Sequence, residues 1–116
     1  MSRSHNNEMV ALSIRQPYAE MILRGLKKSE YRSNATRKRR RVYIYASKKS
    51  ADRPELWRKL KSNPGDLSVG VLVGTVEIVG CSHNGDEYEW KLARPKRLRK
   101  PLRPTRRAQP VFFRPF

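Results

Sequence analysis

A single apolar run between Leu67 and Val79 constrains the fold of this chain more than any other segment. Its apolar residues after Leu67 are mostly β-branched: Val69, Val71, Leu72, Val73, Val76, Ile78 and Val79. A run of this length and composition predicts one central strand that is buried on both faces for part of its length. Gly70 and Gly74 interrupt the run, which predicts bends or bulges of the kind found in a small closed barrel.

The N-terminal third predicts a strand, a helix and a tight turn. Val10, Leu12 and Ile14 alternate with other residues, as expected for a short strand. A helix follows, with Pro17 in its first turn and with Tyr18, Met21 and Ile22 on one face. Gly25 stands where a left-handed helix terminator is expected.

Two β-rich runs, 30–33 and 42–46, flank a polar loop and predict a hairpin-like pair. Asp52 and Glu55 then resemble a capping box for a second short helix, which 63–65 would end. That helix carries Leu56, Trp57 and Leu60, and later strand-like pieces contain Tyr88, Trp90, Leu98 and 111–113. Many short strands and two short helices predict an α+β fold, a compact β-barrel rather than a helical bundle.

Length and charge indicate one strongly basic domain. The chain has 116 residues, with 27 Lys and Arg against 10 Asp and Glu, for a formal charge of +17. We expect a flexible N-terminus over 1–8 and a single domain over 9–116. Residues 1–50, 51–90 and 91–116 carry charges of +10, −3 and +10. Because so much charge repels itself in a small fold, a polyanion, nucleic acid above all, is the expected partner.

Other compositional features exclude several classes of protein. Cys81 is the single cysteine, so the sequence predicts no internal disulfide and no disulfide-linked partner. With His5 and His83 alone, a Cys/His zinc site is not expected, and we predict no metal and no cofactor. The polar start and the absence of a long apolar stretch predict no membrane association and a cytoplasmic location. The expected state is a monomer.

Two basic segments are candidates for contact with a polyanion. The first is the arginine run, which consists of Arg37, Lys38, Arg39, Arg40 and Arg41. Five consecutive cations favour a segment that follows phosphates over a merely solvated surface loop. The second is 91–107, in which Pro95, Pro101 and Pro104 predict an extended edge strand or a loop, with Arg97 and Arg99 as candidate contacts.

The residues after the first helix carry a family resemblance. Gly25, Lys27, Glu30 and Arg32 form the pattern G-x-K-x-x-E-x-R, after an apolar strand and a helix that ends at glycine. This pattern resembles the signature of the ASCH domain family, and the resemblance extends, more loosely, to the end of the chain. It implies a small β-barrel related to the PUA fold, with a cleft beside the signature and RNA as the proposed ligand.

The signature residues also have a physical interpretation. If 30–32 is extended, the side chains of Glu30 and Arg32 share one face and stand about 7 Å apart along the strand. A carboxylate between the cations of Lys27 and Arg32 stays ionised and orients them, so the cluster can hold a phosphate or the polar edge of a base. A structural ion pair that fastens the helix to the barrel is the alternative.

The candidate binding residues are therefore the signature cations and carboxylate, their neighbours and the two basic segments. They are Arg15, Lys27, Glu30, Arg32, Arg37, Lys38, Arg39, Arg40, Arg41, Tyr45, Ser47, Lys48, Arg97 and Arg99. Tyr43 and Tyr45 alternate on one strand, where one can stack on a base and at least one is expected to pack in the core.

A second hypothesis is a hydrolase that acts on RNA or on acylated nucleosides in the same cleft, with Lys27, Glu30 and Tyr45 as candidate catalytic residues. The resemblance implies that some ASCH relatives are ribonucleases or amidohydrolases. In the amidohydrolases a threonine follows the lysine by three residues, whereas this chain has Glu30 at that place. The hydroxyl nucleophile is therefore missing, which favours a binding module.

Overall fold

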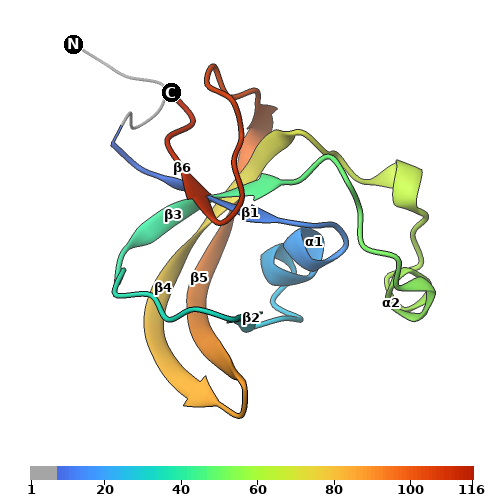
Figure 1. Ribbon diagram of the computed structural model, residues 1–116. Coiled ribbons are helices and arrows are strands. Elements are labelled where there is room, and N and C mark those ends of the chain that lie inside the picture. Colours follow the sequence, from blue (N-terminus) through green and yellow to red (C-terminus); the bar gives the residue numbers. More distant parts are fainter. Residues whose placement is uncertain (1–7) are drawn as a thin grey trace.

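The computed structural model describes residues 8–116, so all but the last residue of the predicted flexible segment 1–8 lies outside the described part. The strands are β1 (Ala11–Ile14), β2 (Ser29–Arg32), β3 (Arg41–Ala46), β4 (Val71–Asn84), β5 (Glu87–Leu102) and β6 (Phe112–Phe113). The helices are α1 (Tyr18–Leu23), α2 (Pro54–Lys59) and the 3-10 turn Pro64–Asp66. This is the small α+β domain with two short helices that the sequence predicts (Figure 1).

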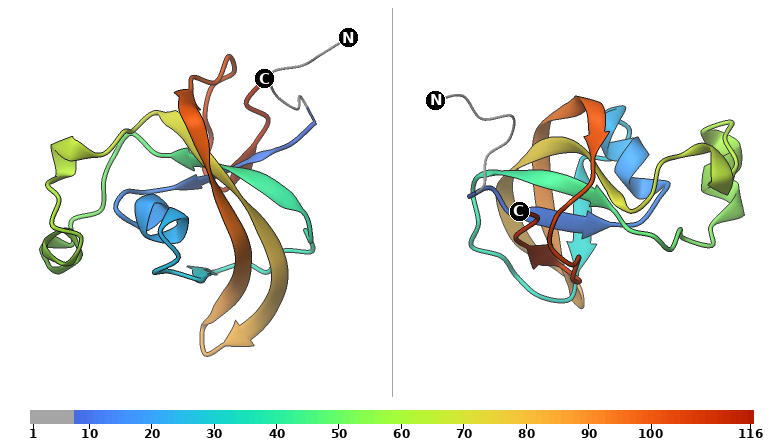
Figure 2. Two further views of the ribbon diagram at one scale, coloured as in Figure 1. Left: turned by 180° about the vertical axis from the view of Figure 1, so that it is seen from behind. Right: turned by 90° about the horizontal axis from the view of Figure 1, so that it is seen from above.

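The six strands form one mixed, curled sheet in the order β2-β5-β4-β3-β1-β6. β1 is parallel to β3, and the other neighbours are antiparallel. Within the described residues the edge strands β2 and β6 do not pair, so the prediction of a closed barrel is not met. A side chain of β2 instead reaches β1, the neighbour of β6, since Arg32 Nη2 donates to the carbonyl oxygen of Ser13 at 2.7 Å. Figure 2 shows the curl from two further directions.

The apolar run forms the interior strand β4, as predicted, although the strand begins at Val71 and continues to Asn84. Residues 72–76 are all buried, so both faces of the strand are covered there. Gly74 lies at a register irregularity, and a Cβ on it would overlap Leu23 of α1 and stand 2.7 Å from the carbonyl oxygen of Lys96. The glycine therefore lets α1 and β5 close on β4.

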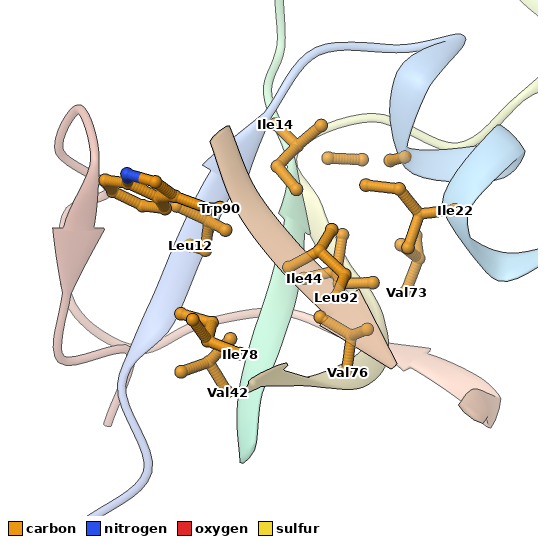
Figure 3. Close-up of a cluster of buried hydrophobic side chains, with 12 residues drawn as sticks. Leu12, Ile14, Ile22, Val42, Ile44, Val73, Val76, Ile78, Trp90 and Leu92 are labelled. Carbon is orange, nitrogen blue, oxygen red and sulfur yellow. The ribbon is translucent and has the colours of Figure 1, made fainter. Parts of the chain in front are cut away.

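Alternation along β1 and β3 divides the core into two clusters. Inside the curl, Leu12 and Ile44 pack with Ile22 of α1 and with Trp90 (Figure 3). On the opposite face a smaller cluster contains Ala11, Tyr43, Tyr45, Leu72 and Phe113, with Leu98, Leu102, Ala108 and Phe116 against it. The C-terminal segment thus covers the second face, and β3 is buried on both sides.

The glycine terminator of α1 is confirmed, whereas Pro17 is the N-cap residue and does not lie in the first turn. Gln16 Oε1 accepts the backbone N–H of Glu20 at 2.9 Å, and Gln16 Nε2 donates to the carbonyl oxygen of Ser68. Gly25 has a φ of +76°, the left-handed conformation expected of a helix terminator. The chain therefore turns sharply from α1 into the residues of the signature.

Two local predictions are wrong. The runs 30–33 and 42–46 do not form a hairpin, because β2 pairs with β5 whereas β3 pairs with β1 and β4. Asp52 does not cap α2; Arg53 is the N-cap residue, and its Nε holds Glu55 Oε2 at 2.6 Å. The predicted helix is nevertheless present, and its Trp57 is buried.

Two of the three prolines of the basic C-terminal segment, Pro95 and Pro101, lie in an extended strand. Residues 91–102 belong to β5, which pairs with β2 through residues 88–91 and beyond that point with β4 alone. Pro95 and Pro101 therefore lie where β5 is an edge strand, and only the part after Leu102 is a loop.

Candidate nucleic-acid interface

A cleft forms where β1 and β3 end. Because these strands are parallel, Arg15, which follows β1, and 47–49, which follow β3, meet at the same end of the sheet. The turn at Gly25 brings β2 across the curl, so Glu30 and Arg32 form the facing wall.

The C-terminal loop, residues 103–111, forms the remaining wall. β6 is antiparallel to β1, so the loop that precedes β6 arrives at the end of β1. Ser13 fixes it there: its N–H donates to the carbonyl oxygen of Val111 at 2.8 Å and its Oγ to that of Gln109 at 2.6 Å. The N–H groups of Thr105 and Arg106 donate to the carbonyl oxygen of Pro115, which closes the loop on itself.

The cleft has a volume of about 820 Å³ and is strongly cationic. Seven basic side chains line it: Arg15, Arg32, Lys48, Lys49, Arg103, Arg106 and Arg107. Glu30 is the one carboxylate among its lining residues. Such a surface attracts phosphate groups and offers one acceptor for a hydrogen-bond donor of a ligand.

Arg32 is held rigidly in the cleft wall. Its Nε donates to Glu30 Oε2 and its Nη2 to the carbonyl oxygen of Ser13, both at 2.7 Å. Its guanidinium also lies 5.6 Å from the ring centre of Trp90. The sequence prediction that Glu30 and Arg32 share one face of an extended segment is confirmed, and the pair joins β2 to β1 while it lines the cleft.

Lys27 lies behind this pair rather than on the cleft surface. Its Nζ is 3.8 Å from Glu30 Oε1, and it stands over the rings of Tyr18 and Tyr31 at 5.2 and 5.5 Å. Tyr18 itself lines the cleft, whereas Lys27 lines a separate cavity of about 250 Å³ between α1 and β5. Lys27 therefore contacts two residues of the cleft, Glu30 and Tyr18, without lining the cleft itself.

The predicted residues after and within β3 reach the cleft. Tyr45, Ser47 and Lys48 all line it, although Tyr45 is 4% exposed and packs edge-on against Phe113 with ring centres 5.2 Å apart. Tyr43 is buried as well and packs against Phe116. The predicted core role holds for both tyrosines, and Tyr45 offers the cleft little ring surface.

The arginine run does not line the cleft. Its residues precede or begin β3, at the opposite end of that strand. Arg41 belongs to β3 itself, and its guanidinium donates to Thr75 Oγ1 at 2.7 Å and to the carbonyl oxygen of Arg94 at 2.9 Å. Lys38 Nζ lies 5.1 Å from the ring centre of Phe112.

Arg97 takes part in an ion cluster outside the cleft, and Arg99 is exposed on β5. Both Nη atoms of Arg97 donate to the carboxylate of Glu20 at 2.9 Å, and Arg24 Nε donates to it at 2.7 Å. Burial opposes ionisation of Glu20, but the hydrogen bonds from Arg97 and Arg24 outweigh it, so the pKa of this carboxyl group lies below its ordinary value. The bond to Glu20 raises the pKa of Arg97.

Sequence reasoning missed several residues of the cleft. They are Ser13, Tyr18, Lys49, Arg103, Arg106 and Arg107. The basic charge of 91–116 indicated Arg103, Arg106 and Arg107 together with Arg97 and Arg99, but it did not show which of these arginines line the cleft. That depends on long-range contacts such as the hydrogen bond between Ser13 and Gln109, which lie 96 residues apart in the sequence.

The described residues contain no group of three or more His, Cys, Asp or Glu side chains arranged to hold a metal ion. Cys81 is a free, half-buried thiol. Among the described helices, none is long and apolar enough to cross a membrane.

Comparison with known proteins places the chain in a family. The ASCH domain model matches residues 12–101, so the chain belongs to the ASCH domain family, whose fold is PUA-like. Two similar relatives are activating signal cointegrator 1 from Homo sapiens and its counterpart from Mus musculus. Each is 34% identical over 80 residues, a match that covers 60% of this chain and 14% of the relative. The chain thus corresponds to a small part of the length of these relatives.

Proposed function

We propose that this ASCH domain binds RNA and that the cleft at the ends of β1 and β3 is its main contact. The main support for RNA binding is the lining of the cleft, which contains seven cations and one carboxylate. Cations spread over a cleft of this volume suit several phosphates of one chain better than a single small anion. Family membership supports the same ligand, because ASCH domains are generally associated with RNA.

The lining side chains divide into two chemical roles. Among the described residues, Lys48, Arg106 and Arg107 are exposed cations whose side chains form no hydrogen bond or ion pair, which suits them to phosphates. Glu30 and Arg32 present a fixed acceptor and a fixed donor side by side, which suits them to the polar edge of a base. In this proposal the loop and the β3 end supply affinity, and the signature pair supplies discrimination.

The test compares two double variants with the same loss of charge. Arg106→Ala with Arg107→Ala removes cations from the cleft, and Arg58→Ala with Lys59→Ala removes exposed cations from α2. For about six phosphate contacts, log K for single-stranded RNA falls with log salt at a slope near −4. We expect the cleft variant to reduce that slope by about 1.4, since each lost contact contributes about 0.7, and the α2 variant to leave it unchanged.

Recovery of the ligand distinguishes binding from hydrolysis. If RNA and acylated nucleosides are recovered unchanged after incubation with the wild-type protein, the result supports a binding module. Chemical conversion of either ligand would favour the hydrolase alternative that uses Lys27, Glu30 and Tyr45. Equal changes of the salt slope in the two double variants would reject the cleft as the RNA site.

A further inference from the structure

The two strongest basic features of the molecule lie at opposite ends of one strand. Arg41, the last residue of the arginine run, begins β3, whereas Ser47 and Lys48 of the cleft follow its end. Resting on the proposed function, we infer that one strand of RNA bound in the cleft continues over the edge strand β6 and contacts the arginine run. The two basic regions then form a single extended site rather than two independent ones.

The loop that carries the arginine run connects these ends physically. It leaves the cleft wall directly after Arg32, and Trp90 Nε1 fixes its start by donating to the carbonyl oxygen of Asn34 at 2.9 Å. The ring of Trp90 stacks on Phe112 of β6, with centres 5.5 Å apart and planes 4° from parallel. Lys38 Nζ lies over the same Phe112 ring at 5.1 Å. The loop therefore reaches β6 through the side chain of Lys38.

β6 lies midway between the two basic regions. Phe112 pairs with Leu12, and Leu12 pairs with Ile44, which is three residues from Arg41 and three from Ser47 along β3. Val111, which lines the cleft, immediately precedes Phe112. A chain that leaves the cleft past Val111 thus meets Lys38 before it reaches the rest of the run.

The span sets a length requirement for the ligand. Six residues of strand at about 3.3 Å each separate the levels of Arg41 and Ser47 by roughly 20 Å. At about 3.4 Å per stacked nucleotide, this distance corresponds to about six nucleotides. A trinucleotide fills the cleft alone, and a ligand of six or more nucleotides reaches both regions.

Two cations of the run are available to such a ligand. Arg37 and Arg40 are exposed, and within residues 8–116 their side chains form no hydrogen bond or ion pair. Arg39 and Arg41, in contrast, donate hydrogen bonds to carbonyl or hydroxyl oxygens of the protein. Substitution of Arg37 and Arg40 therefore removes charge without removing an internal contact.

The test measures affinity for oligouridylates of three, six and nine nucleotides at fixed salt. In the wild-type protein we expect a rise of at least tenfold between three and nine nucleotides. Arg37→Ala with Arg40→Ala should leave the trinucleotide affinity within twofold and remove most of the rise, whereas Arg58→Ala with Lys59→Ala should change neither. Arg106→Ala with Arg107→Ala should weaken all three lengths.

The outcomes separate this inference from the proposed function. A rise with length that survives Arg37→Ala with Arg40→Ala would overturn the continuous site while leaving RNA binding in the cleft intact. Failure of the cleft double variant to weaken the trinucleotide would instead reject the proposed function itself.

Discussion

Glu20 and Glu30 each lie between two cations, yet their surroundings differ. Glu20 is bound by Arg24 and by both Nη atoms of Arg97, and it joins α1 to β5 outside the cleft. Glu30 is bound by Arg32 at 2.7 Å and approached by Lys27 at 3.8 Å, and it faces the cleft. Similar charges thus join two elements in one place and line a cleft in the other, and the topology around each carboxylate decides which.

The largest expected effect is the loss of stability on Glu20→Gln. This change leaves two arginines without their carboxylate, but both guanidinium groups are partly exposed, at 40% and 53%, so water compensates in part. We expect a loss of about 2–3 kcal/mol in the free energy of unfolding, below the range for a fully buried pair. RNA affinity per folded molecule should stay unchanged, and a loss of affinity without a loss of stability would contradict the structural role of Glu20.

Gly74→Ala tests how tightly α1 and β5 pack at the same junction. The added Cβ would overlap Leu23 and approach the carbonyl oxygen of Lys96 to 2.7 Å, so α1 or β5 must shift. We expect a cost of about 1–2 kcal/mol by chemical denaturation. Gly65→Ala is the matched control, because no atom lies within 4 Å of the Cβ position there. Equal stability of the two variants would show that the junction is loosely packed.

The dependence of stability on pH provides a smaller, diagnostic effect. The pKa of Glu20 is lower in the folded protein than its ordinary value of 4.5, so the ionised carboxylate stabilises the fold. That contribution is complete above the unfolded pKa and is lost as the pH falls from about 4.5 through the folded pKa. Melting temperatures between pH 7 and pH 3 should therefore fall less steeply for Glu20→Gln than for the wild type. Parallel curves would show that Glu20 is not a source of the acid sensitivity.

The smallest expected effect on stability is that of Glu30→Gln, at about 1 kcal/mol, because Glu30 accepts one hydrogen bond, from Arg32, and its second cation is 3.8 Å away. Its effect on binding should be more informative. Removal of the one carboxylate among the cleft residues strengthens attraction to phosphates but loses the acceptor for a base. Trinucleotides that differ only in base should then bind with more similar affinities than they do to the wild type. Unchanged discrimination would assign base recognition to other residues.

The sequence predicted the local structure better than the long-range pairing. Alternation in β1 and β3, the terminator Gly25 and the run that forms β4 all depend on neighbouring residues, so their patterns are visible in the sequence. The hairpin prediction was wrong because β2 takes its partner from residues 88–91, where Ser29 Oγ also donates to Glu89. No local pattern specifies that choice.

The candidate site was predictable only in part, for a related reason. Glu30, Arg32, Tyr45, Ser47 and Lys48 were found from the signature and from β3, and they do meet in one cleft. The wall formed by residues 103–111 was missed because it reaches the cleft through the antiparallel pairing of the two-residue strand β6. The predicted contact of Arg97 came from charge alone, which does not reveal that this arginine already has a carboxylate partner, Glu20.

The most direct test of RNA binding in the cleft is the change in backbone amide NMR shifts when a uridine trinucleotide is added. We expect the largest shifts at Ser13, Ser47 and Gln109, which line the cleft, with little change at Trp57 and Leu60 around α2. Shifts confined to 36–41, with none at the cleft residues, would rule out RNA binding in the cleft.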